Sequence, residues 1–233
     1  MQLFYKEELS EINQIFEIDQ QENIHLTKAL RKDIGDHVSV TNGRGLLFLS
    51  EILSISKKRS KLKTIKLLPI NGIESKLTIA IAPTKNITRI EWFIEKSVEI
   101  GIFEIILFNS QNSERRNVNT KRLQLKSLSA MKQSLKYFLP NVSELVNFKT
   151  LLEKFNHFEN KLIASCEENE IDFLKNIKET NKTIVLIGPE GGFTKEELIF
   201  AKKNGFKSVS LGGSRLRTET AGIFVCSVFN ALN

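Results

Sequence analysis

Apolar and polar residues follow two different patterns along the chain. In the first 72 residues, apolar stretches of only a few residues are separated by turn signals such as Asn42-Gly43. Short strands separated by such turns are typical of a small sheet or barrel. The stretches that we expect to be strands are residues 37–41, 46–49 and 64–68.

Two other segments of this region have patterns of their own. Residues 25–32 have the apolar spacing of a helix and end before Gly35, which predicts a short helix beside the barrel. Residues 55–63 are basic and predict an exposed hairpin. Its lysines are either solvated or in contact with RNA, and the pattern alone leaves both interpretations open.

After Asn71 and Gly72 the pattern changes to apolar strands that alternate with longer helices. This alternation is typical of an α/β fold with a mostly parallel sheet and helical crossovers. We therefore predict two domains, residues 1–72 and residues 73–233. The expected strands are 77–82, 104–108, 161–165, 183–187 and 208–211, and the expected helices are 88–100, 120–136 and 221–230, with another helix after Thr194.

The expected strand at 183–187 runs directly into a glycine-rich turn, GPEGG at 188–192. Glycines permit positive φ and leave backbone amides accessible, and ligands often bind at the carboxyl ends of parallel strands. Glu190 would repel a phosphate, so a neutral or cationic ligand suits this turn better. The alternative is a tight strand-to-helix turn, since Thr194 and Glu197 predict a capping box.

A second loop, LGGSRLRTETA at 211–221, follows the expected strand at 208–211. It combines glycines, two arginines and side-chain oxygens at a density that is unusual for a plain connector. Two such loops, each after a parallel strand, can meet and enclose one cofactor. The alternative for part of the loop is that Thr218 or Thr220 caps the last helix and that Arg215 is solvated.

Composition agrees with a folded protein that contacts a polyanion. Hydrophobic residues make up 41% and charged residues 26% of the chain, which is ordinary for a protein with a buried core. The net charge of +7 favours a nucleic-acid partner, although many basic proteins merely have solvated lysines. The longest apolar runs are far shorter than the roughly 20 residues of a membrane helix, and the first residues do not resemble a secretory signal. We expect a cytoplasmic protein.

Neither the cysteines nor the histidines predict a metal site. Cys166 and Cys226 lie in apolar surroundings without a CxxC pair, so each is expected to be a small buried side chain. His25, His37 and His157 are scattered and have no ligand spacing. We expect no metal cofactor.

Five segments of the chain together resemble a known family, the RsmE-type 16S ribosomal RNA uracil-N3 methyltransferases of the SPOUT superfamily. The GPEGG turn and the LRTETA sequence at 216–221 are the most specific of them. RIEWFIEKSVEIG at 89–101 and SerGluArg at 113–115 match as well, and HLTKALRKDIGD at 25–36 is similar to the family's PUA-like N-terminal domain. One departure is that Leu135 and Lys136 follow Gln133-Ser134, where the family often has an arginine.

The resemblance implies a C-terminal domain with a trefoil knot, which binds S-adenosyl-L-methionine, and a homodimer. The implied cofactor pocket consists of Leu186, Ile187, Gly188, Glu190, Gly191, Gly192, Leu211, Gly212, Leu216, Arg217 and Thr220. Much of this contact is expected to come from backbone amides and carbonyls.

The implied reaction sets requirements on further residues. N3 of uracil carries a proton at neutral pH, so we hypothesise that Arg217 stabilises negative charge on the base and that Glu219 or a water accepts the proton. The alternative for Arg217 is an ion pair with Glu190 or Glu219 that holds the loops. The base must leave its stack before N3 can be reached. The candidate contacts to 16S rRNA are Arg31, Lys32, Arg115 and Arg116. A ribosomal substrate also suggests action on the assembled small subunit.

Two other functions are compatible with the sequence. A SPOUT enzyme that methylates the ribose 2′-oxygen or another base would share the fold and the cofactor. A catalytically silent RNA-binding or ribosome-assembly factor would keep the fold without the reaction, although the intact glycines and Arg217 argue against that loss.

Overall fold

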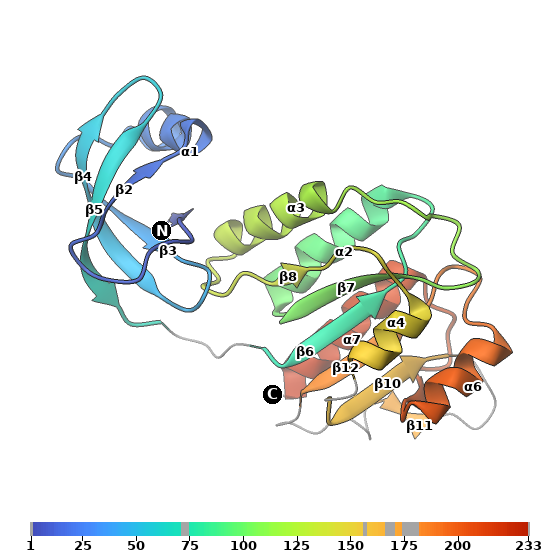
Figure 1. Ribbon diagram of the computed structural model, residues 1–233. Helices are drawn as coiled ribbons and strands as arrows, with labels where there is room; N and C mark the ends of the chain where they lie inside the picture. Colours follow the sequence, from blue (N-terminus) through green and yellow to red (C-terminus); the bar gives the residue numbers. More distant parts are fainter. Residues whose placement is uncertain (1, 71–74, 156–157, 166–170, 174–181, 233) are drawn as a thin grey trace. The chain divides into compact units, whose positions relative to one another are not determined.

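The computed structural model describes residues 2–70, 75–155, 158–165, 171–173 and 182–232 (Figure 1). The chain forms two compact units. The first consists of Met1–Glu74 together with Met131–Leu139, and the second of Ser75–Ala130 together with Pro140–Asn233. The boundary predicted near residue 72 falls at 71–74, outside the described residues.

The first unit is a five-stranded sheet in the order β1-β3-β4-β5-β2. β1 pairs with β3 in parallel, and the other neighbours are antiparallel. The strands are β1 (Leu3–Tyr5), β2 (Ile15–Ile18), β3 (His37–Thr41), β4 (Leu47–Ile55) and β5 (Ser60–Leu68). The predicted strands are confirmed, and the basic segment is the β4–β5 hairpin, whose turn is closed by the Ser56 amide donating to the Arg59 carbonyl at 2.9 Å.

The helix predicted at 25–32 lies nearer the N-terminus than expected. It begins as α1 (Gln20–Ile24), because Asp19 caps it by accepting a hydrogen bond from the Glu22 amide at 2.8 Å. It continues as a π-helical turn, η1 (His25–Ala29). Leu26 from this turn is buried in the core of the unit together with Phe4 and Phe48.

A segment far along the chain completes the first unit. The Gly45 amide donates to the Tyr137 carbonyl at 2.9 Å, and the Leu139 amide donates to the Gly43 carbonyl at 2.8 Å. The helix predicted at 120–136 therefore ends early, at Gln133, since the backbone of the following residues pairs with the 43–45 turn. Leu135, with a φ of 54°, lies just after this end.

The second unit contains a parallel sheet in the order β11-β13-β10-β12-β6-β7-β8, with β9 also paired to β7. Its strands are β6 (Leu77–Ile81), β7 (Glu104–Asn109), β8 (Asn141–Val142), β9 (Val146–Asn147), β10 (Asn160–Ala164), β11 (Ile171–Asp172), β12 (Thr183–Ile187) and β13 (Lys207–Ser210). The parallel sheet and its five longer strands are confirmed. The two-residue strands were not predicted, because so short a segment has no periodicity to recognise.

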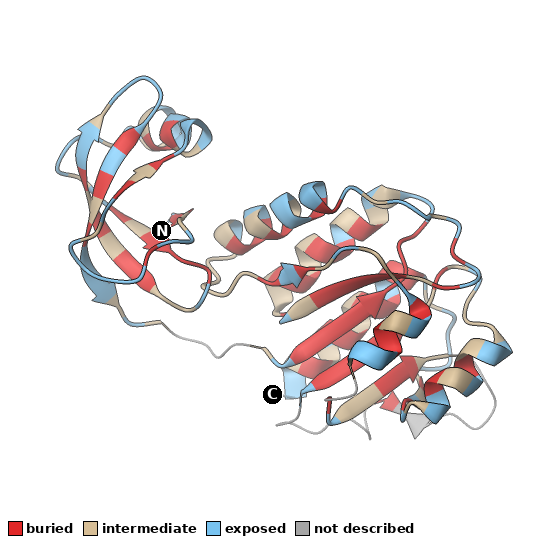
Figure 2. Cartoon of the chain, in the orientation of Figure 1, coloured by how far each residue is buried: buried red, intermediate tan, exposed pale blue. Residues whose placement is uncertain are grey.

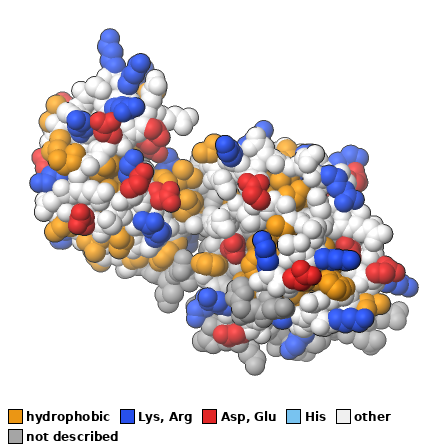
Figure 3. Space-filling view, in the orientation of Figure 1, with side chains coloured by type: hydrophobic (Ala, Val, Ile, Leu, Met, Phe, Trp, Pro, Cys, Tyr) orange, Lys and Arg blue, Asp and Glu red, His pale blue; other side chains and the backbone are white. Residues whose placement is uncertain are grey.

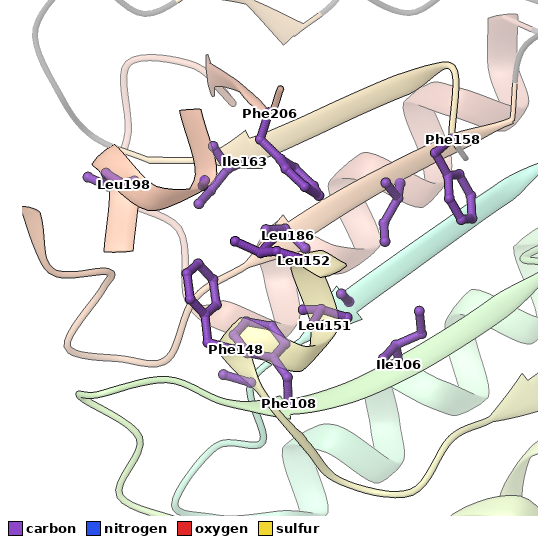
Figure 4. Close-up of a cluster of buried hydrophobic side chains, with 14 residues drawn as sticks. Ile106, Phe108, Phe148, Leu151, Leu152, Phe158, Ile163, Leu186, Leu198 and Phe206 are labelled. Carbon is purple, nitrogen blue, oxygen red and sulfur yellow. The ribbon is translucent and has the colours of Figure 1, made fainter. Parts of the chain in front are cut away.

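Helices cover both faces of this sheet (Figures 1 and 2). They are α2 (Ile87–Ile100), α3 (Thr120–Gln133), α4 (Phe148–Lys154), α6 (Lys195–Lys203) and α7 (Thr218–Leu232). On one face, α4 and α6 bury Leu151 and Leu198 against Ile106 and Leu186 of the strands (Figure 4). On the other face, α7 contacts α2, β6 and β12. The short helix α4 was not predicted.

Among the described helices, none is long and apolar enough to span a membrane.

The C-terminal part of the chain doubles back on itself. From β12 it passes through α6 to β13, which lies beyond β10, and it returns through residues 211–217 to α7, which contacts β6 and β12. The chain thus passes β10 twice, and the trefoil knot that the resemblance implies stays a prediction.

α2 and α7 pack in parallel through a ladder of contacts. Gly222 lies against the ring of Phe93, the Cys226 thiol donates to the Ser97 carbonyl at 3.6 Å, and the Asn230 amide donates to the Gly101 carbonyl. The contacts advance in the same direction along both helices. Small residues allow this close approach.

We predict that Gly222→Ala destabilises the protein by about 1–3 kcal/mol, because the added Cβ would overlap the Phe93 ring and force the helices apart. Thermal denaturation followed by circular dichroism measures this. Gly213→Ala is the control, since a Cβ there meets no atom within 4 Å. Equal melting temperatures for the two variants would contradict the packing argument.

Candidate functional site

The two glycine-rich loops lie together at the carboxyl edge of the parallel sheet. The strands end level there, with Ile187 of β12 opposite both Ile81 of β6 and Ala164 of β10. The Thr218 hydroxyl, in the second loop, donates to the Gly188 carbonyl in the first at 3.0 Å. The prediction that the two loops meet is therefore confirmed.

Glu190 is part of the framework that holds the first loop. Its carboxylate accepts a hydrogen bond from the Lys85 amide at 3.1 Å, and its carbonyl accepts one from the Arg215 guanidinium at 3.4 Å. The loop after β6 is thereby attached to the GPEGG turn. The Glu190 carboxylate therefore has a backbone partner within the protein.

The loop after β7 holds the other end of the turn. The Asn112 side-chain amide donates to the carbonyls of Gly191 and Gly192, at 3.3 and 3.1 Å. One oxygen of Glu197 accepts from the Gln111 amide at 2.8 Å. Four loops, from β6, β7, β12 and β13, are thus joined into one cluster.

The capping box at the start of α6 is confirmed. The Thr194 hydroxyl accepts from the Glu197 amide at 3.2 Å, and the Glu197 carboxylate accepts from the Thr194 amide at 2.9 Å. Because the same carboxylate also reaches the β7 loop, the cap fixes the end of the GPEGG turn as well as the helix.

Two glycines leave open space beside their backbone. Gly192 and Gly212 have φ values of 70° and 116°, which favour glycine, and no atom lies within 4 Å of a Cβ built on either. A flat ligand can therefore approach the backbone of both loops closely.

The remaining predicted pocket residues differ in exposure. Leu186 and Ile187 are buried in β12, and Leu186 packs into the core, so a ligand could meet it only through its backbone. Leu211 and Leu216 are half-buried, and Thr220 is exposed on the first turn of α7.

Arg217 and Glu219 flank Thr218 but have opposite surroundings. Arg217 is exposed, and its carbonyl accepts a hydrogen bond from the Ala221 amide at 2.8 Å. The Glu219 side chain is only 9% exposed, and its Oε1 lies 3.6 Å from Nε of Arg89 in α2. Its Oε2 is buried without a hydrogen-bond partner among the described residues. The alternative ion pair between Glu219 and Arg217 is not the one observed, because Arg89 takes that place.

The four candidate RNA contacts divide between the two units. Arg31 is exposed in the first unit, with a φ of 51°, and Lys32 pairs with Asp36 at 3.7 Å. In the second unit Arg115 donates to the carbonyls of Thr84 and Lys85. Arg115 thus holds the β6 loop, whatever else it contacts.

Arg116 differs from its neighbour. It is exposed and donates to the Gln111 carbonyl at 3.1 Å. The exposed Lys85 ammonium pairs with Glu114 at 2.9 Å, and this hydrogen bond raises the pKa of Lys85 above its ordinary value. In the view of Figure 3, Lys and Arg side chains are interspersed with Asp and Glu on each of the two units.

Within the described residues, no three His, Cys, Asp or Glu side chains gather as metal ligands would. His157 and Cys166 lie outside those residues. Cys226 is buried, as expected.

Sequence reasoning did not assign roles to Lys85, Arg89 or Asn112. Lys85 and Asn112 lie in the loops after β6 and β7, and Arg89 lies in the first turn of α2, which follows the β6 loop. Lys85 acts through its backbone amide, which no side-chain pattern could reveal. Asn112 stands directly before the SerGluArg motif, and Arg89 is the first residue of the motif at 89–101, which are the signals the sequence offers for these two.

The chain is similar to known proteins in its sequence and in its fold. A model of the RNA methyltransferase domain matches residues 72–230, and a model of the RNA methyltransferase PUA domain matches residues 21–65. Ribosomal RNA small subunit methyltransferase E of Rickettsia conorii is 30% identical over 216 residues, which are 91% of this chain and 87% of that protein.

Two solved structures are similar over essentially the whole chain. A probable rRNA-methyltransferase from Porphyromonas gingivalis has a TM-score of 0.91 at 34% identity, covering 100% of this chain and 98% of that chain. Ribosomal RNA small subunit methyltransferase E from Neisseria gonorrhoeae, bound to S-adenosyl methionine, has a TM-score of 0.88 at 25% identity, with the same coverage of both chains.

We predict that Thr218→Val lowers the free energy of unfolding by about 1 kcal/mol, because Gly188 loses the hydroxyl that joins the two loops. Chemical denaturation measures the change. Thr220→Val, the same substitution at an exposed position of the same turn, serves as the control. If both variants unfolded alike, the hydrogen bond would not be what holds the loops together.

Proposed function

Because this chain belongs to the family of ribosomal RNA small subunit methyltransferase E and carries its RNA methyltransferase domain, we propose that it transfers the methyl group of S-adenosylmethionine to N3 of a uridine in 16S ribosomal RNA. The observation that supports this most directly is the hydrogen bond between Thr218 and Gly188, which brings two otherwise separate glycine-bearing loops to one place.

The loop cluster fits the proposed cofactor. The open backbone of Gly192 and Gly212 accepts a flat group, and the turn has neither the lysine nor the spacing of a phosphate-binding loop. When bound, S-adenosylmethionine supplies a methyl group on a positively charged sulfur. The proposed binding residues are Leu186, Ile187, Gly188, Glu190, Gly191, Gly192, Leu211, Gly212, Leu216, Arg217 and Thr220, with Leu186 and Glu190 acting through the backbone and the loop framework.

Arg217 is the proposed catalytic residue. Methylation forms a bond from N3 to the methyl carbon, breaks the bond from that carbon to sulfur and releases the N3 proton. Negative charge develops on the uracil carbonyl oxygens as the proton leaves, and an exposed guanidinium at the start of α7 can stabilise it. Glu219 is buried against Arg89, which favours water over Glu219 as the proton acceptor.

RNA binding is proposed to involve both units. We assign residues 1–72 to a PUA-like RNA-binding domain, supported by the match over residues 21–65, and residues 73–233 to the methyltransferase domain. Arg31 and Lys32 would contact RNA from the first unit, and Arg115 and Arg116 from the second. A ribosomal substrate also favours a cytoplasmic enzyme that acts on the assembled small subunit, and we expect a homodimer.

The decisive test is methyl transfer from labelled S-adenosylmethionine to purified small subunits and to naked 16S rRNA, followed by nucleoside analysis. We expect N3-methyluridine. A 2′-O-methylated nucleoside or another methylated base would reject the proposed position on the nucleotide, and uptake of cofactor without any transfer would favour a silent binding protein.

We predict that Arg217→Ala reduces methyl transfer at least about 100-fold, because the developing charge on uracil loses its partner. The dissociation constant for S-adenosylmethionine, measured by calorimetry, should stay within a few-fold of the original. Near-normal turnover by this variant would reject Arg217 as the catalytic residue.

We predict that RNA affinity falls steeply with salt, because phosphate contacts release counterions. Arg116→Ala should lower the salt dependence by about one unit of slope without changing the melting temperature. Arg115→Ala should also lower the melting temperature, since Arg115 holds the β6 loop. Fluorescence anisotropy with an rRNA fragment gives the slopes. Affinity that is insensitive to salt would count against RNA binding by these arginines.

A further inference from the structure

The buried Glu219 has a partner that its position in the sequence does not suggest. Burying a carboxylate is costly unless a charge or hydrogen bonds compensate for it, and the nearest cation is Arg89, with Nε at 3.6 Å from Oε1. Glu219 lies in the first turn of α7, where a negative charge also interacts favourably with the helix dipole. The pair therefore joins the first turns of α7 and α2.

This ion pair is the charged step of the α2–α7 ladder. The steps below it are Phe93 with Gly222, Ser97 with Cys226 and Gly101 with Asn230, and their contacts involve no full charge. Arg89 and Glu219 continue the same spacing toward the loop cluster. The Arg89–Glu219 pair is thus the end of the ladder nearest to the loop cluster, since Glu219 follows Thr218, which is bonded to Gly188.

The start of α2 is itself fixed to the loop cluster. The Arg89 amide donates to the Asn86 carbonyl at 3.1 Å, and Asn86 caps the helix. The preceding residue, Lys85, donates its amide to Glu190 in the GPEGG turn. Arg89 therefore extends from a part of the chain whose position is already set by the proposed cofactor loop.

The backbone of Arg217 is held in place by the first turn of α7, which also contains Glu219. The Arg217 carbonyl accepts from the Ala221 amide, so the Arg217 backbone is part of the first turn of α7. Thr218 attaches this turn to Gly188 on one side, and Glu219 attaches it to Arg89 on the other. A turn held at only one of these points could rotate, and the exposed guanidinium of Arg217 would move with it.

We infer that Arg89 is a positioning residue for methyl transfer, which acts through Glu219 to orient the first turn of α7 and with it Arg217. The inference rests on the proposed function. Neither Arg89 nor Glu219 needs to touch the base or the cofactor in this role. Misplacement of a reacting group by about 1 Å can cost about 100-fold in rate, so a distant ion pair can matter as much as a direct contact.

The test compares Arg89→Met with a matched variant, Arg122→Met. Arg122 in α3 pairs at 2.6 Å with Glu91, which is also in the first half of α2. Glu91 is two residues after Arg89 and therefore lies on a different side of the helix from the ladder with α7. We expect Arg89→Met to lower kcat about 10- to 100-fold at saturating substrates, with the S-adenosylmethionine dissociation constant little changed. The melting temperature should also fall, because the buried Glu219 carboxylate loses its counter-ion, and Glu219→Gln in the same chain should restore part of it. Arg89→Lys should recover most of the rate, and Arg122→Met should match the unaltered chain.

A double-mutant cycle separates this role from proton transfer by Glu219. If the pair acts as a unit, Arg89→Met combined with Glu219→Gln lowers kcat no further than the more impaired single variant. A Glu219→Gln loss far larger than that of Arg89→Met would overturn the inference in favour of Glu219 as proton acceptor.

Two further outcomes would also overturn it. One is an unchanged kcat for Arg89→Met. The other is a loss of cofactor affinity as large as the loss of kcat, which would mean that Arg89 supports the whole loop cluster and not the orientation of Arg217 alone. Absence of transfer by the unaltered chain would refute the proposed function itself.

Discussion

The loops at the carboxyl edge of the parallel sheet hold one another through hydrogen bonds from side chains to backbone. Glu190 accepts from the β6 loop, Asn112 donates to the GPEGG turn, and Thr218 donates to Gly188. Each bond spans segments distant in sequence, so no loop can take its shape alone. The level ends of the strands make this possible, because they bring the four loops to the same height.

Consecutive residues of the LRTETA motif have different roles in this arrangement. In the sequence from Arg217 to Glu219, the first side chain faces solvent, the second joins two loops and the third is buried against α2. An α-helix has 3.6 residues per turn, so consecutive side chains point in different directions around its axis. Only one of the three is therefore free to meet a substrate.

Much of the fold and part of the site could be predicted from the sequence. The long apolar strands, α2 with its end at Gly101, and the capping box of Thr194 and Glu197 all depend on local patterns, and the structure contains each of them. The partners of Glu190 and Glu219 could not be predicted, because Lys85 and Arg89 are more than a hundred residues away in the chain. Ion pairs and backbone contacts at that separation leave no periodic signal. The early end of α3 has the same cause, since the pairing of residues 137–139 with the 43–45 turn is set by tertiary structure.

The membership of Met131–Leu139 in the first unit has a consequence for protein engineering. A single cut near residue 72 would not release either unit intact. The N-terminal fragment would lack the segment that pairs with Gly43 and Gly45, and the C-terminal fragment would carry that segment with its backbone groups unmatched. Modular exchange of the N-terminal unit between relatives would have to transplant both stretches of chain together.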